Sequence, residues 1–325
     1  MRFLLDTEQR AFAESLDAML TAADTPAVVR AWGRGEHGPG RALWSRIAEA
    51  GVFALAAPEA YEGVGPLPVE LAVAFVELGR HAVPGPLVET ATAAVLLAAL
   101  EDPGPAERLL PALLSGKAMA TVAPSPRSYA LDGDAATTRL SLDPDRGGLC
   151  LSPGHGPIRP SLDPARRLAP LSPGGESLAT SPSALARALT WARLAVAAQA
   201  LGVGLALLDR TVAYVGQRTQ FGVPIGSFQA VKHRLADAKV ALEFARPLVF
   251  GAAVTLDAAD AAAAKVTACE AAYTTARTAL QLHGAIGYTA EYDLSLWLAK
   301  ARALRTAWGT PAECRGTVLG GGRRR

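Results

Sequence analysis

The stretch from Ser181 to Arg218 carries alanine and leucine on almost every side of the helix that its sequence predicts. Ser181 followed by Pro182 is a good helix start, because serine caps free N–H groups and proline suits the first helical position. A helix that is hydrophobic nearly all round is buried on several sides. The chain therefore has to supply partner helices that enclose this segment.

The rest of the C-terminal half predicts those partners. Three further helical segments follow, at residues 227–253, 258–284 and 289–308. Four long helices predict a four-helix bundle. The first ~115 residues also have helical spacing of apolar residues, including a helix over residues 4–22.

The composition changes near Lys117, where proline, glycine, serine and aspartate become frequent. Short alternating segments there predict strands, at residues 118–123, 137–143 and 148–153. A disordered linker is the alternative. We predict a mainly α protein with a small central β-domain, divided into residues 1–117, 118–175 and 176–325.

Composition excludes several classes of function. Half of the 325 residues are hydrophobic and 19% are charged, as in a compact protein, and the net charge of +2 gives no basic field for nucleic acid. Three widely spaced cysteines predict free thiols in a reducing cytoplasm, and five histidines show no metal-ligand spacing. With no signal peptide and no uncharged apolar stretch of ~18 residues, we expect a cytoplasmic protein without a membrane span.

The segment RTQFGVPIGSFQAVKH, residues 218–233, is richer than a helix-to-helix turn needs. Arg218 offers a planar fork of donors that suits phosphate oxygens, and Phe221 offers a flat face to an aromatic ring. Two glycines allow a ligand near the backbone, and Gln229 adds a neutral polar group. This set suits a nucleotide diphosphate better than a metal, although an ordinary loop is the alternative.

A second cluster lies in QLHGAIGYTAEYDLSLWLAKAR, residues 281–302. Gln281 and Gly284 stand at a helix boundary, where N–H groups of the next helix can face an anion. The spacing is not G-x-G-x-x-G and no strand precedes it, so a Rossmann site is not indicated. A simple glycine cap is the alternative.

Taken together and in order, these segments resemble the acyl-CoA dehydrogenase family. The resemblance covers nearly the whole chain and is carried by residues 43–80, 218–238 and 279–304. It implies an N-terminal helical domain, a short β-barrel-like domain and a C-terminal four-helix bundle, with bound FAD. It also implies an acyl-CoA thioester as substrate and electron-transfer flavoprotein as a possible acceptor.

The resemblance assigns roles to particular residues. Arg218, Phe221 and Gln229 match positions that contact the FAD of a neighbouring subunit. The second motif gives Gln281 and the Gly284 loop to the adenylate end. Thr310, in the Gly-Thr pair near the C-terminus, is the sixth expected cofactor-binding residue.

The sequence departs from the family where the reaction needs a base. Trp308 stands where many members carry the catalytic glutamate, and its indole has no basic lone pair. Ala192 stands where another branch carries it, before Arg193. We therefore assign no catalytic residue. Three carboxylates are possible substitutes, none of them in a family motif: Glu270, Glu291 and Glu313.

The central domain also departs from the family. The motif usually written Thr-Glu-Pro reads TVAPSPRS at residues 121–128, and residues 118–175 contain no tryptophan. Residues 118–175 are also fewer than the central domain of the family usually contains. We expect the accessory subunit of a heteromeric acyl-CoA dehydrogenase, paired with a homologous subunit. A self-sufficient homo-oligomeric enzyme and a non-redox acyl-CoA-binding protein are the alternatives.

Overall fold

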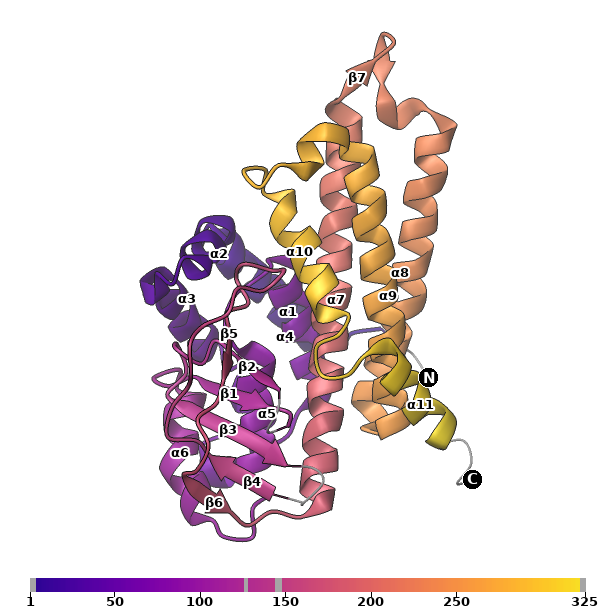
Figure 1. The fold of residues 1–325 in the computed structure, drawn as a ribbon. Coiled ribbons are helices and arrows are strands. Elements are labelled where there is room, and N and C mark those ends of the chain that lie inside the picture. The colour runs from indigo at the N-terminus through magenta and orange to yellow at the C-terminus, as the bar shows by residue number, and fades with distance from the viewer. Residues whose placement is uncertain (1–3, 126–127, 144–147, 322–325) are drawn as a thin grey trace.

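The computed structural model describes residues 4–125, 128–143 and 148–321, and its N-terminal third is helical (Figure 1). Asp6 starts the first helix with a capping box, because its carboxylate accepts from Gln9 N–H while the Gln9 side chain accepts from Asp6 N–H. The elements are α1 (Thr7–Thr21), α2 (Thr25–Gly33), α3 (His37–Glu49), the short turns η1 (Ala54–Ala56) and η2 (Glu59–Tyr61), α4 (Pro68–Arg80), α5 (Leu87–Leu97) and α6 (Gly104–Leu114).

The central region is a small β unit. A four-stranded sheet has the order β1-β3-β4-β6, with β1 parallel to β3 and the other neighbours antiparallel. A separate antiparallel pair joins β2 to β5. The bounds are β1 (Ala120–Ala123), β2 (Tyr129–Leu131), β3 (Thr138–Asp143), β4 (Gly148–Leu151), β5 (Leu168–Pro170) and β6 (Glu176–Leu178).

The C-terminal half forms a helical bundle that extends beyond the other two regions (Figure 1). Ser181 caps its first helix, accepting a hydrogen bond from Ala184 N–H at 3.2 Å. The elements are α7 (Pro182–Gln217), the hairpin β7 (Thr219–Gln220) and β8 (Val223–Pro224), η3 (Ile225–Ser227), α8 (Gln229–Thr255), α9 (Ala258–His283), η4 (Gly284–Tyr288), α10 (Leu294–Leu304) and α11 (Pro311–Gly321).

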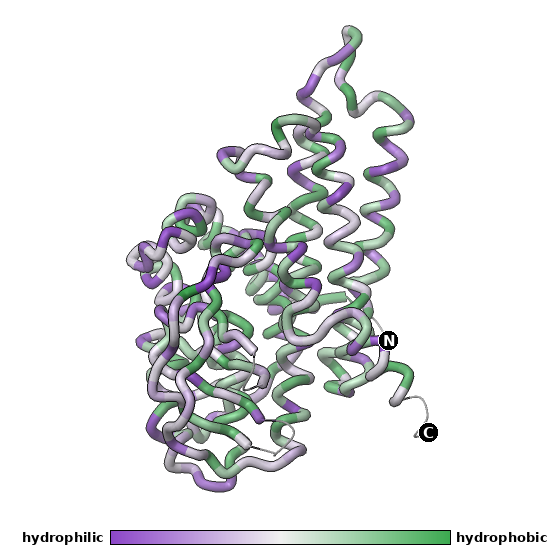
Figure 2. Tube along the Cα trace, viewed as in Figure 1, coloured by the Kyte–Doolittle hydropathy of each residue, from purple (hydrophilic) through white to green (hydrophobic). Residues whose placement is uncertain are grey.

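Helix α7 is the axis of the protein, packed against α9, α8 and α10 of the bundle and against α4 and α5. Among the described helices it alone is long and apolar enough to cross a membrane, a feature the sequence analysis missed. Its apolar window is entirely buried inside the protein, so other helices already cover that surface. Hydrophobic residues run through all three regions (Figure 2).

Two glycines bring α4 and α7 unusually close. A Cβ on Gly202 would lie 1.9 Å from the carbonyl oxygen of Val76, and one on Gly79 would lie 2.1 Å from that of Gln199. Any side chain at either position would separate the helices. The backbones of the first region and the bundle are therefore in direct contact.

The predicted fold class is confirmed: helices, then a small β region, then a helical domain. The three expected strands are present as β1, β3 and β4, which excludes a linker without structure. The hairpin β7–β8 and the helix α11 were not predicted, and the last predicted helix, at residues 289–308, is shortened to α10. The domain bounds at residues 117 and 175 stay predictions.

Candidate functional site

Trp308 lies between α10 and α11, where its indole reaches a buried carboxyl. Its Nε1–H donates to Glu89 Oε1 at 3.1 Å, and the two residues are 7% and 4% exposed. Trp308 has φ 56°, a left-handed conformation that non-glycine residues rarely adopt. Such conformations persist only where the surroundings hold them.

The backbone around Trp308 is held by two cations. Arg193 Nε lies 3.5 Å from the Trp308 carbonyl oxygen. Buried Lys265 donates to the Gly309 carbonyl at 2.7 Å and to the Arg305 carbonyl at 3.2 Å. Because Ala192 directly precedes Arg193 on α7, Ala192 lies close to Trp308 in space. Neither carries a carboxylate in this chain.

Glu89 was missed by the sequence analysis. It is the only glutamate in the apolar run LVETATAAVLL, and that was the available signal, because an isolated acid on a buried helix needs a partner. Burial raises the pKa of Glu89, since desolvation penalises its charged form, while Arg166 and the Trp308 bond oppose the shift.

Other buried charges surround this pair where all three regions meet. Lys300 Nζ lies 3.6 Å from Asp163 Oδ2 and 3.4 Å from the Val83 carbonyl oxygen, and both side chains are almost fully buried. Burial also raises the pKa of Asp132 to about 8. The junction therefore holds acids whose environment favours the neutral form.

The three substitute bases proposed from sequence do not lie in this junction. Glu270 pairs with Arg305 at 2.9 Å on a half-exposed face. Glu291 is exposed, at the start of the turn before α10. Glu313 accepts from Thr310 N–H at 2.6 Å and from its hydroxyl at 3.0 Å, and these bonds lower its pKa and make it a weaker base.

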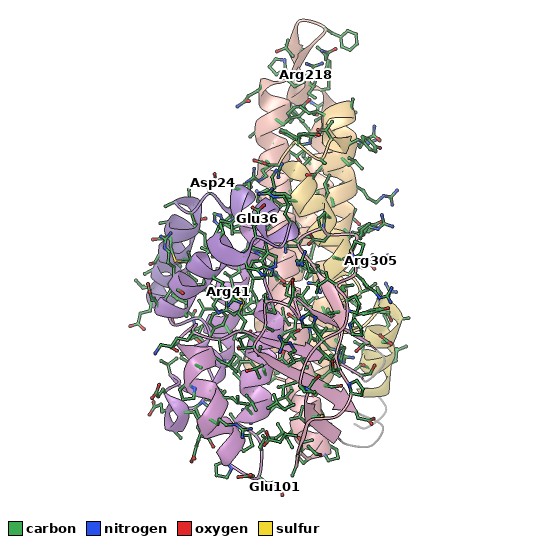
Figure 3. The ribbon with its side chains drawn as sticks, turned by 60° about the vertical axis from the view of Figure 1, so that its left-hand side comes forward. Asp24, Glu36, Arg41, Glu101, Arg218 and Arg305 are labelled. Carbon is green, nitrogen blue, oxygen red and sulfur yellow. The ribbon has the colours of Figure 1, made fainter. Side chains whose placement is uncertain are left out.

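The first predicted binding segment, residues 218–233, projects into solvent at the end of the bundle (Figure 3). Phe221 is 92% exposed at the tip of the β7–β8 hairpin, with φ 54°. Arg218, which ends α7, and Gln229, which begins α8, are exposed as well. No ion pair of the described residues involves Arg218.

The second motif lies at the same end of the bundle. Tyr214, one turn before Arg218, stacks on His283 with ring centroids 4.2 Å apart and donates to the His283 carbonyl. Gln281 and Gly284 flank His283, and Gly284 has φ 64°. The structure therefore brings the two motifs together.

Thr310 lies apart from those motifs. Its neighbour Gly309 contacts Lys265, near the start of α9. At the helical rise of about 1.5 Å per residue, Lys265 and Gln281 lie about 24 Å apart along α9. In this chain Thr310 belongs with Trp308, and its hydroxyl is already engaged by Glu313.

A cavity of about 390 Å³ opens beside the junction, between α9, α10 and the segment before β5. Its wall includes Thr306 and Ala307, the two residues before Trp308, and three arginines: Arg166, Arg302 and Arg305. A second cavity of about 350 Å³ shares Leu162, Tyr273 and Arg302 with the first. The two therefore form one continuous groove along α9 and α10.

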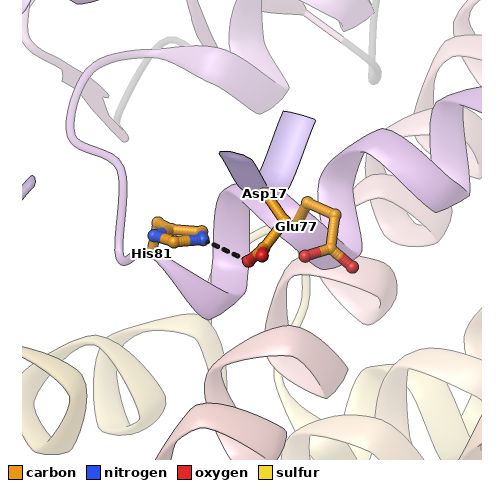
Figure 4. Close-up of side chains that lie close together, drawn as sticks. All are labelled: Asp17, Glu77 and His81. Carbon is orange, nitrogen blue, oxygen red and sulfur yellow. Dashed lines mark hydrogen bonds and ion pairs between the residues drawn. The ribbon is translucent and has the colours of Figure 1, made fainter. Parts of the chain in front are cut away.

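A cluster of three side chains joins α1 to the C-terminal end of α4 (Figure 4). His81 Nε2 lies 2.8 Å from Asp17 Oδ1, and the ligand atoms of Asp17, Glu77 and His81 lie within 4.8 Å of one another. Arg80 pairs with Glu77 at 3.6 Å, which already places a cation at the cluster. Burial raises the pKa of Glu77 to about 7.

Comparison with known proteins identifies the family. The model of the acyl-CoA dehydrogenase N-terminal domain matches residues 6–117, and that of the C-terminal domain matches residues 183–319. Acyl-CoA dehydrogenase IpdE2 of Mycolicibacterium smegmatis is 34% identical over 95% of this chain and 97% of its own length. The chain belongs to the acyl-CoA dehydrogenase family.

Two solved relatives extend the comparison within the family. A Tcur3481-Tcur3483 steroid ACAD variant is 26% identical, with a TM-score of 0.87 over 98% of this chain and 99% of its own. The ChsE4-ChsE5 complex of Mycobacterium tuberculosis is 24% identical, with a TM-score of 0.84 over 100% of this chain and 98% of that one, and shows the same fold. FAD is the cofactor of this family, and one solved neighbour is PigA with FAD and proline.

Proposed function

We propose that this chain is the accessory subunit of a heteromeric, FAD-dependent acyl-CoA dehydrogenase. The complex would introduce an α,β-double bond into an acyl-CoA thioester, and the homologous partner subunit would supply the catalytic base. The observation that carries the proposal is the bond between Trp308 and buried Glu89, which fills the family's base position with a group that cannot accept a proton.

The alternative of a self-sufficient homo-oligomeric enzyme, in which this chain uses an unconventional base, has less support. A base must lie within hydrogen-bond reach of the proton that it removes. Glu270 and Glu313 are engaged elsewhere, and Glu291 is exposed. Glu89 is covered by Trp308 inside the core.

The tip of the bundle fits FAD that a neighbouring subunit holds. Arg218 and Phe221 extend a cation and an aromatic ring into solvent, and Phe221 is 92% exposed. The central region fits the flavin ring poorly, since Tyr129 is its only tyrosine, phenylalanine or tryptophan. When bound, FAD accepts the hydride from the substrate. Arg218, Phe221, Gln229, Gln281 and Gly284 would hold its diphosphate and adenylate end, whereas Thr310 would act only if Glu313 released it.

An exposed apolar stripe supports a protein partner. Val240, Phe244 and Leu248 repeat every fourth residue along α8 and are 52%, 71% and 43% exposed. Exposed apolar rows of this kind mark interfaces. The complex named ChsE4-ChsE5 has two differently named chains, and we propose a homologous partner here too.

The relatives also suggest the substrate class. One solved relative is described as a steroid ACAD, so we propose a steroid-derived acyl-CoA ester. Electron-transfer flavoprotein is the proposed electron acceptor, and the cytoplasm the proposed location.

Co-expression with a genomically adjacent homologue tests the proposal. We expect a complex that contains both chains and retains flavin, whereas this chain made alone retains little. Subunit and flavin counts on both samples measure this. One FAD per chain in the isolated protein, with oxidation of an acyl-CoA, would refute the accessory role.

A further inference from the structure

Asp17, Glu77 and His81 form a cluster of metal-ligating side chains where α1 packs against α4. Glu77 lies in the last turn of α4 and His81 ends that helix, so the two side chains, four residues apart, share one face. Asp17 reaches them from α1, and the three side chains are directed toward one another (Figure 4). Two helices therefore bring one imidazole and two carboxylates together.

The carboxylate of Glu77 lacks a partner that offsets its burial. Its side chain is 13% exposed, and in the part of the chain that the structure describes no group donates a hydrogen bond to it. Arg80 Nε lies 3.6 Å away, whereas Arg80 Nη2 lies 3.0 Å from Asp209 on α7. Desolvation raises the pKa of Glu77 to about 7, and the charge of Asp17 adds to the shift that Arg80 and Arg246 oppose. The cations already present therefore do not satisfy this carboxylate.

The spacing of the ligand atoms suits a small transition-metal ion. Zn²⁺ holds nitrogen and oxygen ligands at about 2.0–2.2 Å, so two ligand atoms on one ion lie at most about 4.4 Å apart. The atoms of the cluster lie within 4.8 Å of one another, and His81 Nε2 is 2.8 Å from Asp17 Oδ1. The Asp17 side chain is 51% exposed, so it can turn by the small amount that the ion requires. Its open side also admits water as a fourth ligand.

We propose that Asp17, Glu77 and His81 form a binding site for a divalent transition-metal ion, with Zn²⁺ as the best fit. An imidazole nitrogen favours Zn²⁺ over Mg²⁺ and Ca²⁺, which take oxygen ligands. The ion replaces the hydrogen bond between His81 and Asp17 and links α1 to α4, while Arg80 keeps its ion pair with Asp209. None of the three ligands is among the residues that the proposed function uses.

Titration calorimetry of the untagged full chain with ZnCl₂ at pH 7.5 tests the site, after EDTA treatment and dialysis. We expect one Zn²⁺ per chain with a dissociation constant on the order of 10 µM or lower, and much weaker binding of Mg²⁺. His81→Gln and Asp17→Asn should each weaken Zn²⁺ binding by about tenfold or more, because each removes a ligand. Asp17→Asn preserves the shape of a half-exposed side chain, so this variant should fold, and circular dichroism checks the folding of both.

Two further measurements locate the ion. Bound Co²⁺ should give visible absorption that His81→Gln abolishes. Because the ion links two helices, hydrogen exchange of the α1 amides should slow when Zn²⁺ is added. For openings that break the site, the slowing reaches about 100-fold at a free Zn²⁺ concentration 100 times the dissociation constant. The same concentration of Zn²⁺ should slow exchange far less in Asp17→Asn.

His233→Gln is the matched control, because it removes an exposed histidine on α8 that lies outside the cluster. It should bind Zn²⁺ like the unsubstituted protein. Absence of saturable Zn²⁺ binding up to about 0.1 mM would overturn the inference. So would unchanged affinity in the double variant of Asp17→Asn and His81→Gln, or Mg²⁺ binding as tight as that of Zn²⁺. None of these measurements uses flavin or turnover, so the metal site and the proposed function can fail independently.

Discussion

At the scale of single residues, Trp308 shows how one side chain can be held by contacts from several elements. Its left-handed backbone is held by the side-chain bond to Glu89 and by the cations that contact the adjoining carbonyls. Because strained conformations cost about 1–3 kcal/mol, these contacts have to compensate for the strain. The indole is therefore a structural part of the junction.

The bond between Trp308 and Glu89 should contribute measurably to stability. Trp308→Phe leaves a buried carboxyl oxygen unpartnered, and we expect the free energy of unfolding to fall by about 1–3 kcal/mol through that loss. Trp191→Phe is the matched control, because the buried Trp191 Nε1 has no hydrogen-bond partner to lose. Urea denaturation measures both, and equal losses in the two variants would show that the bond contributes nothing.

Glu77 should make stability depend on pH. Its folded pKa of about 7 exceeds the ordinary 4.5, so the folded state binds the proton more tightly between those values. Stability from this group is therefore present at low pH and decreases as pH rises from about 4.5 to about 7. Asp132, with a pKa of about 8, acts in the same direction.

Removal of the Glu77 charge should flatten this dependence. The free energy of unfolding of the unsubstituted protein should fall between pH 5 and pH 8. In Glu77→Gln we expect this decrease to be smaller by about 2–3 kcal/mol. Chemical denaturation at both pH values measures the difference. Glu243→Gln, at a half-exposed glutamate, should behave like the unsubstituted protein; a Glu77→Gln protein with the same pH slope would contradict the burial argument.

At the scale of elements, the contact between α4 and α7 depends on the absence of side chains. Gly202→Ala would place a methyl group against the Val76 carbonyl, and we expect a loss of about 1–3 kcal/mol or more. Gly216→Ala is the control on the same helix, because nothing lies within 4 Å of its added Cβ. That variant should gain about 0.5–1 kcal/mol, as is usual for alanine over glycine in a helix. Thermal unfolding measures the stability change in both variants. Equal changes in the two would contradict the close packing of α4 and α7.

Substitutions in the β7–β8 hairpin should weaken the retention of flavin and leave the free energy of unfolding unchanged. In the isolated chain, Arg218→Ala and Phe221→Ala should change the unfolding free energy by less than about 0.5 kcal/mol, since both residues are exposed. In the co-purified complex, Arg218→Ala should weaken FAD retention by roughly tenfold or more through lost phosphate contacts. Arg187→Ala, exposed at the other end of α7, is the control; flavin retention equal in the two variants would exclude the tip from the cofactor site.

The elements also show what sequence could predict. Periodicity and capping predicted the helices and strands because each has a strong local cause, such as Ser181 at the start of α7. The hairpin was missed because its two strands have two residues each and little sequence pattern. Glu89 and the arginine groove were missed because their partners come from distant segments, which only the folded chain brings together.

At the scale of the whole molecule, the three regions meet at a buried junction that contains Trp308. Glu89, Asp163 and Trp308 come from different regions and are all nearly inaccessible. The tip of the bundle remains free to reach another subunit (Figure 1). The molecule thus combines a filled centre with an exposed hairpin, which agrees with the proposal of a subunit that completes the site of a partner.

The most direct test of this account is the turnover of the co-purified complex in which Glu89 and each of the three carboxylates considered as a substitute base are replaced in turn. The variants are Glu89→Gln, Glu270→Gln, Glu291→Gln and Glu313→Gln, and acyl-CoA oxidation is followed by flavin bleaching. The account predicts rates within about twofold of the unsubstituted complex, because loss of a true general base costs roughly 10²-fold or more. A loss of that size in any one variant, with the complex and its flavin intact, would contradict it and identify a base in this chain.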